Sequence, residues 1–375
     1  MKRIMLVYGT RPEAIKLASL ELAAKGREDV EIIHCSTGQH REMLDQVLSL
    51  FEITPDHDLS VMAPNQDLFD VTSKVLLGMR EVLRSQKPDA VVVQGDTTSC
   101  FAGALAAFYE NIPVAHVEAG LRTWNLRAPF PEEANRVLTS RIVTHHFPPT
   151  EWAAENLRAE RVDDGAMEVT GNTVIDALLW VREKVEALGP GAFDALGPVR
   201  RILEEDRPYV LITGHRRENF GGGFEAICRA LRRLASDRPD WSFIYPVHLN
   251  PNVRGPVYET LGGLENVHLI EPQEYAPFVL LMDRSRIILT DSGGVQEEAP
   301  SLGKPVLVMR EVTERPEAVE AGTVRLVGTD EEKIVAEVSR LIDDESHYTA
   351  MARAHNPYGD GKAAQRILDY LAREL

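Results

Sequence analysis

Cysteine, long apolar runs and basic charge are all scarce in this sequence. Its 375 residues include only three cysteines, at positions 35, 100 and 228. Because these are far apart and form no C-x-x-C pair, the sequence indicates neither a zinc site nor a disulfide framework. The apolar run near the N-terminus is shorter than the ~7–15 residues of a signal peptide, and no run approaches the ~18–20 residues of a membrane span. We therefore expect a cytoplasmic protein with no membrane segment.

Acidic residues outnumber basic ones, 58 Asp and Glu against 41 Lys and Arg, which gives a net charge of −17. This charge argues against general binding to nucleic acid or to anionic membranes. An anionic ligand would need a local basic cluster to hold it. A hydrophobic content of 44% and a charged content of 26% are ordinary for a soluble enzyme and exclude a disordered chain. At roughly 100–200 residues per domain, the length predicts two domains.

Two nucleotide-binding fingerprints are missing. No G-x-G-x-x-G motif follows an apolar run, and no G-x-x-x-x-G-K-[ST] motif occurs, so neither a dinucleotide cofactor nor a P-loop is indicated. His116 lies inside an apolar run, which favours a core histidine over a metal ligand, and the same holds for His145 and His146. We therefore assign no metal and no cofactor.

Short apolar runs, each followed by a polar loop and in most cases an amphipathic stretch, recur along the chain. They are apolar throughout and do not alternate, so both faces of each strand should be buried, as in a parallel sheet covered by helices. In the first half they span residues 4–8, 30–35, 89–94 and 112–117. In the second half they span residues 209–213, 241–247, 266–270, 286–290 and 304–309. This repetition predicts an α/β protein with two Rossmann-like domains.

The Gly- and Pro-rich segment 188–198 interrupts the pattern and is the best candidate for the end of an interdomain linker. We expect the first domain to span residues 1–170 and the second to span residues 171–360. The last amphipathic stretch, residues 361–375, follows a sharp break and can return to the first domain.

Polar loops at the carboxyl ends of the strands are the expected place for a ligand, since open parallel sheets bind ligands there. Asp96, Glu118 and Glu132 lie in or near such loops of the first domain. Each has an ordinary alternative: Asp96 can cap a helix, and Glu118 can pair with an arginine. Glu132 can form a surface pair with Arg136 one turn later. Three acids at the loops of one domain favour a shared catalytic role.

The same loops supply basic residues from both domains. Arg11 and Lys16 flank a predicted helix start in the first domain, and His215 and Arg216 follow a strand of the second. Guanidinium and ammonium groups in such places suit phosphate oxygens. The alternative is a set of solvated loop charges.

Ser292, Gly293 and Gly294 follow a predicted strand and open a helix. Free backbone N–H groups and the helix dipole attract anions at such a terminus, and glycines allow close approach. A plain turn with Ser292 as the helix cap is the alternative. A carboxylate of Glu297 or Glu298 in the first turns of that helix can accept both hydroxyls of a ribose. The segment therefore favours a nucleoside diphosphate.

The most informative motifs are long and contiguous. They are GTRPEAIK (9–16), GQHREMLDQVL (38–48), QGDTTS (94–99), HVEAGLRT (116–123), PEEANR (131–136), TGHRREN (213–219), TDSGGVQEEAPSLGKPVLVMRE (290–311) and HNPYGDG (355–361). In this order and spacing they resemble, from end to end, the bacterial non-hydrolysing UDP-N-acetylglucosamine 2-epimerases. The resemblance implies a glycosyltransferase-B-type architecture, with a cleft between two Rossmann-like domains, and a homodimer. It implies interconversion of UDP-GlcNAc and UDP-ManNAc.

The resemblance also implies roles for single residues. Asp96, Glu118 and Glu132 fall on catalytic positions, and we add His215 to the catalytic set as a cation for the departing diphosphate. Positions that contact the UDP-sugar are matched by Arg11, Lys16, Arg136, His215, His248, Phe278, Ser292, Gly293, Gly294 and Glu298. Phe278 falls where the uracil is packed.

Many bacterial members bind a second UDP-GlcNAc as an activator, and the loop around Gln39, His40 and Glu42 matches that region. Some members carry glutamine where Glu42 stands, and an acid there could repel a diphosphate. A histidine often precedes the Gly-Asp pair in the family, whereas this chain has Gln94. We expect Gln94 to tune activity without abolishing it.

Without a dinucleotide cofactor, the remaining route to inversion at C2 is elimination of UDP to a 2-acetamidoglucal, followed by re-addition of UDP. Rival hypotheses are a glycosyltransferase that needs an acceptor, a hydrolysing epimerase that releases free ManNAc, and an epimerase of another UDP-2-acetamido sugar. A non-catalytic UDP-sugar sensor is a fourth, and the intact acids argue against it. The sequence identifies no dimer interface.

Overall fold

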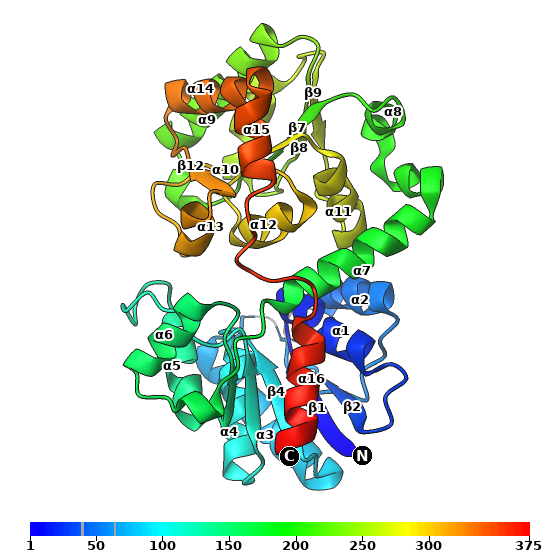
Figure 1. Ribbon diagram of the computed structural model, residues 1–375, viewed down its shortest axis with the longest axis vertical. Coiled ribbons are helices and arrows are strands. Elements are labelled where there is room, and N and C mark those ends of the chain that lie inside the picture. Colours follow the sequence, from blue (N-terminus) through cyan, green and yellow to red (C-terminus); the bar gives the residue numbers. More distant parts are fainter. Residues whose placement is uncertain (39–40, 64) are drawn as a thin grey trace. The chain divides into compact units, whose positions relative to one another are not determined.

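In the computed structural model the chain forms two compact units (Figure 1). The structure describes residues 1–38, 41–63 and 65–375. The first unit comprises Met1–Ala177 and Tyr358–Leu375, and the second comprises Leu178–Pro357. Gln39 and His40, expected in an activator region, lie outside the described residues.

The first unit is built on a parallel sheet in the order β3-β2-β1-β4-β5-β6. Its strands are β1 (Lys2–Tyr8), β2 (Val30–Ser36), β3 (His57–Asp58), β4 (Ala90–Gln94), β5 (Val114–Val117) and β6 (His145–Phe147). The strand order reverses between β1 and β4, as in Rossmann folds. The prediction of buried parallel strands is confirmed for β1, β2, β4 and β5. The short strands β3 and β6 were not predicted.

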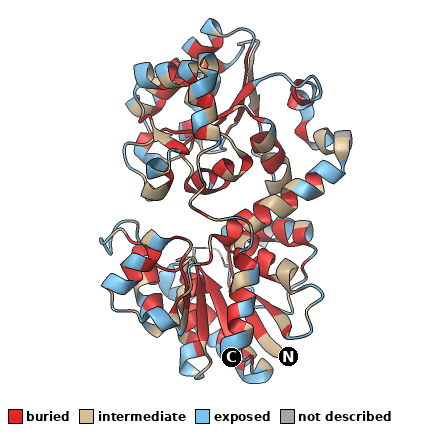
Figure 2. Ribbon diagram, in the orientation of Figure 1, coloured by how far each residue is buried: buried red, intermediate tan, exposed pale blue. Residues whose placement is uncertain are grey.

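Helices cover both faces of the first sheet. They are α1 (Arg11–Ala24), α2 (Arg41–Phe51), α3 (Leu68–Gln86), α4 (Thr98–Tyr109), α5 (Glu132–Ile142), α6 (Glu151–Ala159) and α16 (Ala363–Glu374), with one 3-10 turn, η1 (Asp164–Ala166). Met5 and Val7 of β1 pack in one core with α3 and α4. The intervening Leu6 is also fully buried, and Figure 2 shows the strands of this sheet as buried. Burial on both faces explains why these strands are apolar throughout.

The last helix, α16, belongs to the first unit and packs against α1. Arg27, just after α1, forms an ion pair of 2.6 Å with Asp369 of α16. The Tyr370 hydroxyl donates a hydrogen bond to the Gly165 carbonyl (3.2 Å), and its ring meets Phe147 of β6 edge-on. The C-terminal segment is therefore an integral part of the first unit.

The second unit repeats the same topology, with a parallel sheet in the order β12-β11-β10-β7-β8-β9. Its strands are β7 (Tyr209–Thr213), β8 (Ser242–Pro246), β9 (Val267–Ile270), β10 (Ile287–Thr290), β11 (Val306–Val308) and β12 (Val324–Leu326). The order reverses between β7 and β10. The predicted fold of two Rossmann-like domains is therefore confirmed. The three-residue strand β12 was not predicted.

Helix α7 (Thr173–Ala187) begins in the first unit and ends in the second. The remaining helices are α8 (Arg200–Glu204), α9 (Gly222–Asp237), α10 (Pro251–Leu261), α11 (Tyr275–Arg284), α12 (Gly293–Glu298), α13 (Pro316–Glu320), α14 (Glu331–Asp343) and α15 (Glu345–Ala352), with 3-10 segments η2 (Gly189–Val199), η3 (Arg217–Asn219) and η4 (Ala299–Leu302). Phe224 of α9, Val257 of α10 and Ile334 of α14 share one core with the strands. Across the described helices, none is both long and apolar enough to cross a bilayer.

The Gly- and Pro-rich segment 188–198 does not end a linker, so that expectation was wrong. The units divide between Ala177 and Leu178, within α7. The segment lies inside the second unit as 3-10 turns with a kink at Gly197 (φ 52°, ψ −118°). Its composition resembles a linker, but Leu196 is buried and the segment packs against α8 and α11.

The start of the loop after β5 contains two residues with positive φ and is packed closely against α6. Glu118, the first residue past the strand, has φ 62°, and Gly120 has φ 92°. The Asn156 side chain donates to the Gly120 carbonyl (3.0 Å). A Cβ on Gly120 would lie 2.2 Å from the Ala153 carbonyl oxygen. Glycine at position 120 thus permits the turn that presents Glu118.

Gly120→Ala should destabilise the protein strongly, because the added Cβ meets backbone and the positive φ remains. A strained φ costs on the order of 1 kcal/mol, and overpacking adds about 1–3 kcal/mol. We expect urea unfolding to report a loss of about 2–4 kcal/mol. Gly26→Ala is the matched control, since Gly26 has φ 82° but a Cβ there would meet no described atom within 4 Å. Equal losses in both variants would contradict the packing argument.

Candidate active site

Two of the predicted acids follow neighbouring strands of the first sheet. β4 and β5 are paired in parallel, with Gln94 opposite Val117. Asp96 lies two residues beyond the end of β4, and Glu118 lies one residue beyond the end of β5. The two acids therefore follow the carboxyl ends of adjacent parallel strands.

Asp96 is compensated by a buried arginine of α5. Its carboxylate lies 3.0 Å from the Arg136 guanidinium, which is also 3.4 Å from Glu133. The Asn135 side chain donates to the Asp96 backbone carbonyl (2.9 Å). The residue that caps α4 is Thr97, whose hydroxyl accepts the Cys100 N–H (3.0 Å). The capping alternative for Asp96 is therefore wrong.

Among the contacts that the structure describes, the cation beside Glu118 is a lysine. Its carboxylate forms an ion pair with Lys16 of α1 and accepts a hydrogen bond from the Gln94 side chain. The Lys16 and Glu118 side chains are only 12% and 10% exposed. Gln94, noted as a departure from the family, is therefore a direct partner of a predicted catalytic acid.

Glu132 and Arg11 each stand at a helix start. Glu132 is the first residue of α5 and is half-buried, and Arg11 is the exposed first residue of α1. The alternative of a surface pair between Glu132 and Arg136 is absent from the described contacts. Arg136 donates weakly to the Glu132 backbone carbonyl (3.4 Å), and its ion pairs go to Asp96 and Glu133. The Arg136 side chain is buried, and this places its guanidinium beside the Asp96 carboxylate.

Glu13, which the sequence analysis did not single out for a role of its own, holds the loop after β1. It is fully buried, and one oxygen accepts the backbone N–H groups of Gly9 (3.0 Å) and Thr10 (2.8 Å). Its other oxygen accepts the Thr97 hydroxyl (2.6 Å). Burial raises the pKa of Glu13, and these donors oppose the rise. Glu13 thereby ties the loop of Arg11 to the loop that carries Asp96.

In the second unit, the loops after β7 and β8 bring two predicted histidines together. The rings of His215 and His248 stack with centroids 5.3 Å apart and planes 17° apart. His215 lies 3.5 Å from the carboxylate of Asp291, which follows β10. Burial lowers the pKa of His215, and the charge of Asp291 opposes this.

Ser292, Gly293 and Gly294 begin α12, as predicted. Arg315, to which the sequence assigned no role, lies against them: a Cβ on Gly293 would meet its guanidinium at 2.9 Å. Arg315 pairs with Glu297 at 2.8 Å. No short-range pattern signals it, because it comes from the segment before α13.

Glu298 accepts a hydrogen bond from the hydroxyl of Tyr275 (2.6 Å), the first residue of α11. Phe278, predicted to pack a base, lies one turn later on the same helix and is half-buried. Helix α11 therefore carries the ring of Phe278 and also fixes the Glu298 carboxylate through Tyr275. Glu42, the remaining predicted residue, falls in α2.

Histidine and cysteine side chains also lie in the interior of the protein. His116 is fully buried and its Nε2 lies 2.7 Å from the Gly95 carbonyl oxygen. Burial lowers the pKa of His116 to about 3, so the ring is neutral. The prediction of a core histidine is confirmed. All three cysteines are buried. No group of three or more His, Cys, Asp or Glu among the described residues is arranged to hold a metal.

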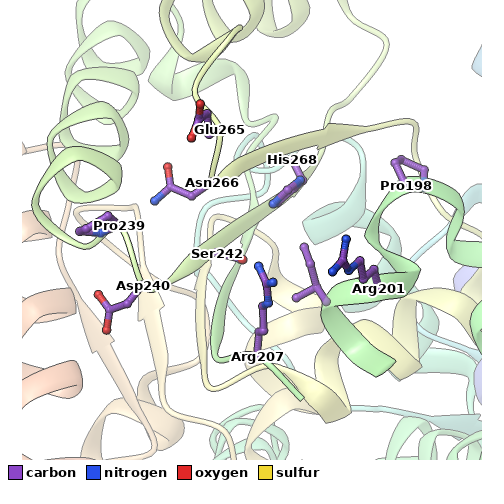
Figure 3. A pocket seen from close by; sticks show the side chains of 10 residues that line it. Pro198, Arg201, Arg207, Pro239, Asp240, Ser242, Glu265, Asn266 and His268 are labelled. Carbon is purple, nitrogen blue, oxygen red and sulfur yellow. The ribbon is translucent and has the colours of Figure 1, made fainter. Parts of the chain in front are cut away.

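A cavity of about 310 Å³ in the second unit lies apart from these loops (Figure 3). It is lined by residues at the amino ends of β7, β8 and β9, including Arg201, Arg207 and His268. Both arginines pair with Glu205, and Asp240 and Glu265 also line the cavity. Its positive charge is therefore already balanced, and none of the predicted site residues lines it.

Comparison with known proteins assigns the family. A family model described as UDP-N-acetylglucosamine 2-epimerase matches residues 22–372. The UDP-N-acetylglucosamine 2-epimerase of Escherichia coli K12 is 57% identical over 369 residues, 98% of each chain. The chain belongs to the UDP-N-acetylglucosamine 2-epimerase family. The enzyme of the same name from Campylobacter jejuni is 51% identical over 375 residues, which is 100% of this chain and 98% of that one.

Solved structures of UDP-N-acetylglucosamine 2-epimerases share the fold. The Neisseria meningitidis enzyme, bound to UDP-GlcNAc, is 50% identical with a TM-score of 0.88, covering 99% of this chain and 100% of that one. The Methanocaldococcus jannaschii enzyme, in complex with UDP-GlcNAc and UDP, is 33% identical with a TM-score of 0.79 and full coverage of both chains. The family predicted from the motifs is confirmed, and the chain is an epimerase.

Arg136→Met should destabilise this epimerase, because it leaves the buried Glu133 and the partly buried Asp96 without their shared cation. Removing one partner from a buried ion pair costs about 3–5 kcal/mol. We expect chemical denaturation to report a loss of about 3 kcal/mol. Arg201→Met, which breaks only the exposed pair with Glu205, is the matched control and should unfold at the wild-type midpoint. A similar midpoint for Arg136→Met would show that Arg136 does not compensate these acids.

Proposed function

We propose that the chain interconverts UDP-GlcNAc and UDP-ManNAc by inverting C2 of the sugar. The observation that carries the proposal is the pair of acids after β4 and β5, each compensated by a cation, in a chain 57% identical to an epimerase over 98% of its length. The relative from Neisseria meningitidis, bound to UDP-GlcNAc, supports the choice of substrate.

The chemistry proceeds by elimination, because the C2 proton is not beside a carbonyl. The bond from C1 to the UDP oxygen breaks, and its electron pair leaves with UDP. A carboxylate removes the C2 proton, and the electrons of that C–H bond form the C1=C2 double bond of 2-acetamidoglucal. A proton then returns to C2 on the opposite face while UDP re-adds to C1. No net oxidation occurs, so the cycle needs no redox partner.

The leaving diphosphate needs positive charge and N–H donors. We assign Arg11, Lys16 and His215 to this task, together with the backbone N–H groups of Ser292, Gly293 and Gly294. Removing one such contact typically costs ~10²–10³-fold in rate. Arg315, beside Gly293, adds a further cation to that set, and His248 supports His215 through the stacked rings.

Asp96, Glu118 and Glu132 serve as the acids and bases on the two faces of C2. General acid–base catalysis of this kind contributes ~10²–10⁴-fold per group. In the second unit, Phe278 packs the uracil and Glu298 accepts the ribose hydroxyls, with Tyr275 fixing the carboxylate.

The proposal extends to a cytoplasmic homodimer. It also extends to a second UDP-GlcNAc as activator at the region of Gln39, His40 and Glu42. The acid at position 42 should weaken that binding, since carboxylate and diphosphate repel.

Proton NMR of the purified protein with UDP-GlcNAc alone in D₂O tests the function. We expect a UDP-ManNAc anomeric signal with deuterium at C2, and traces of glucal and UDP would support elimination. Free ManNAc with an equal amount of UDP would establish a hydrolysing enzyme instead. No reaction, with UDP-GlcNAc still bound, would indicate a transferase awaiting its acceptor or another UDP-sugar as substrate.

Asp96→Asn, Glu118→Gln and Glu132→Gln should each lower kcat by ~10²–10⁴-fold, because each removes an acid or base from C2. Binding of UDP should persist, since UDP lacks the reacting sugar. Turnover in a coupled assay and UDP affinity by calorimetry measure the two effects. Glu110→Gln, at the surface pair with Arg84, is the control. A variant with wild-type turnover would remove its residue from the catalytic set.

His215→Ala should weaken UDP binding by ~10–100-fold, the size of one hydrogen bond to a charged group. His268→Ala, at the amino end of β9, is the matched control and should bind UDP normally. Calorimetric titration with UDP measures both. An unchanged affinity in His215→Ala would refute the role of His215 at the diphosphate.

A further inference from the structure

The carboxylate of Asp291 fixes the loop that carries His215. Asp291 follows β10, is fully buried, and accepts the backbone N–H groups of His215 and Arg216 through Oδ2, both at 2.8 Å. Just before these residues, the hydroxyls of Thr213 and Thr290 hydrogen-bond at 2.6 Å across the paired strands β7 and β10. The loop therefore leaves the sheet in one defined direction.

The second oxygen of Asp291 is directed to the imidazole. Oδ1 lies 3.5 Å from His215 Nδ1 and has no hydrogen-bond partner among the described residues. A buried carboxylate oxygen with no partner is costly. A proton on His215 Nδ1 would supply a donor, and protonation of both ring nitrogens would add an opposite charge. Asp291 thus has one oxygen for the backbone and one for the ring.

We propose that Asp291 is a positioning residue, which holds the His215 loop through Oδ2 and, through Oδ1, keeps the imidazole oriented with a proton on Nδ1. The use of this cation at the diphosphate rests on the proposed function. The contact between Asp291 and His215 does not.

Two carboxylates of the first unit, Glu13 and Glu133, also bind successive backbone N–H groups, in a structural role. Glu13 accepts the N–H groups of two successive residues, Gly9 and Thr10. Glu133 does the same for Thr123 (3.0 Å) and Trp124 (2.9 Å). Neither forms an ion pair with a histidine among the described contacts. Asp291 shares the backbone clamp and adds a titratable partner, so its two roles can be separated by substitution.

The groups around His215 determine whether loss of the Asp291 charge raises or lowers the pKa of His215. Burial lowers the pKa of His215, the like charges of Arg216 and His248 lower it further, and only Asp291 raises it. Removing the Asp291 charge should therefore lower the pKa of His215. Binding of UDP through a protonated His215 should then be lost at a lower pH than in the wild type.

Asp291→Asn tests the charge while keeping the clamp, because the amide oxygen can accept both N–H groups. We would follow the imidazole C–H signals of the histidine-labelled full chain by NMR, with His215→Gln to assign the resonance. We expect the midpoint of His215 to fall by about one pH unit or more, the effect of one close opposite charge. His268, at the other end of the sheet, should not move. An unchanged His215 midpoint would overturn the proposal.

The wild-type protein provides a second measurement if Asp291→Asn fails to fold. Neutral His215 should carry its proton on Nδ1, facing Asp291, because the partner of a ring nitrogen fixes the tautomer. The ¹⁵N shifts of the ring distinguish the tautomers. A proton on Nε2 would refute the orientation.

Affinity for UDP at two pH values connects the proposal to function. Asp291→Asn should bind UDP about tenfold more weakly than wild type near pH 7.5, and should recover at low pH, where His215 is protonated in both. A merely structural defect would weaken binding equally at both values and would overturn the charge role. Inactivity toward UDP-GlcNAc with the NMR shifts as expected would reject the proposed function alone.

Discussion

Ionised side chains at the edges of two apolar sheets impose the main constraint on this molecule. A charge taken out of water needs a counter-charge or several N–H donors in its place. Glu118 has Lys16 and Gln94, Asp96 has Arg136, and Asp291 has two backbone N–H groups. The contacts that compensate these charges also fix their positions, so stability and placement of the reactive groups have the same origin.

The two units share one topology, and an aspartate at the equivalent position of each has a different role. Asp96 and Asp291 each follow the strand next to the point where the strand order reverses, β4 in the first sheet and β10 in the second. The Asp96 side chain is 29% exposed, whereas Asp291 is fully buried. The exposed acid can meet a substrate, and the buried one can act only through its neighbours. Surroundings, not strand position, decide which role a carboxylate takes.

The sequence predicts the parts of the structure that depend on local pattern. Continuous apolar runs identify the central strands, and the loops after them contain Asp96, Glu118 and His215. The edge strands β3, β6 and β12 span only two or three residues, too few for any period to be seen. The segment 188–198 misleads because its composition is that of a linker, while its Leu196 is buried and the segment packs against α8 and α11.

Partnerships between distant residues could not be predicted. Lys16 and Glu118 are 102 residues apart in the sequence. Considered separately, Lys16 suits phosphate binding and Glu118 suits catalysis, and neither pattern indicates the other as its partner. In the sequence, Glu13 and Asp291 are only two acids among the loop residues, because their partners are backbone N–H groups that a sequence does not display. The place of Arg315 beside Gly293 was not predicted for a similar reason, since only the fold brings the two together.

The state of the three thiols has a practical consequence. Cys35, Cys100 and Cys228 are buried, and burial raises the pKa of Cys35 and of Cys228 to about 12 and also raises that of Cys100. Thiolate is the reactive form, so the three thiols of the native protein should not react with maleimides or mild oxidants. A single cysteine introduced on the surface would then take a fluorophore or spin label selectively, with no need to remove the natural ones. Conversely, uptake of a thiol reagent by the unaltered chain would report local opening of its cores.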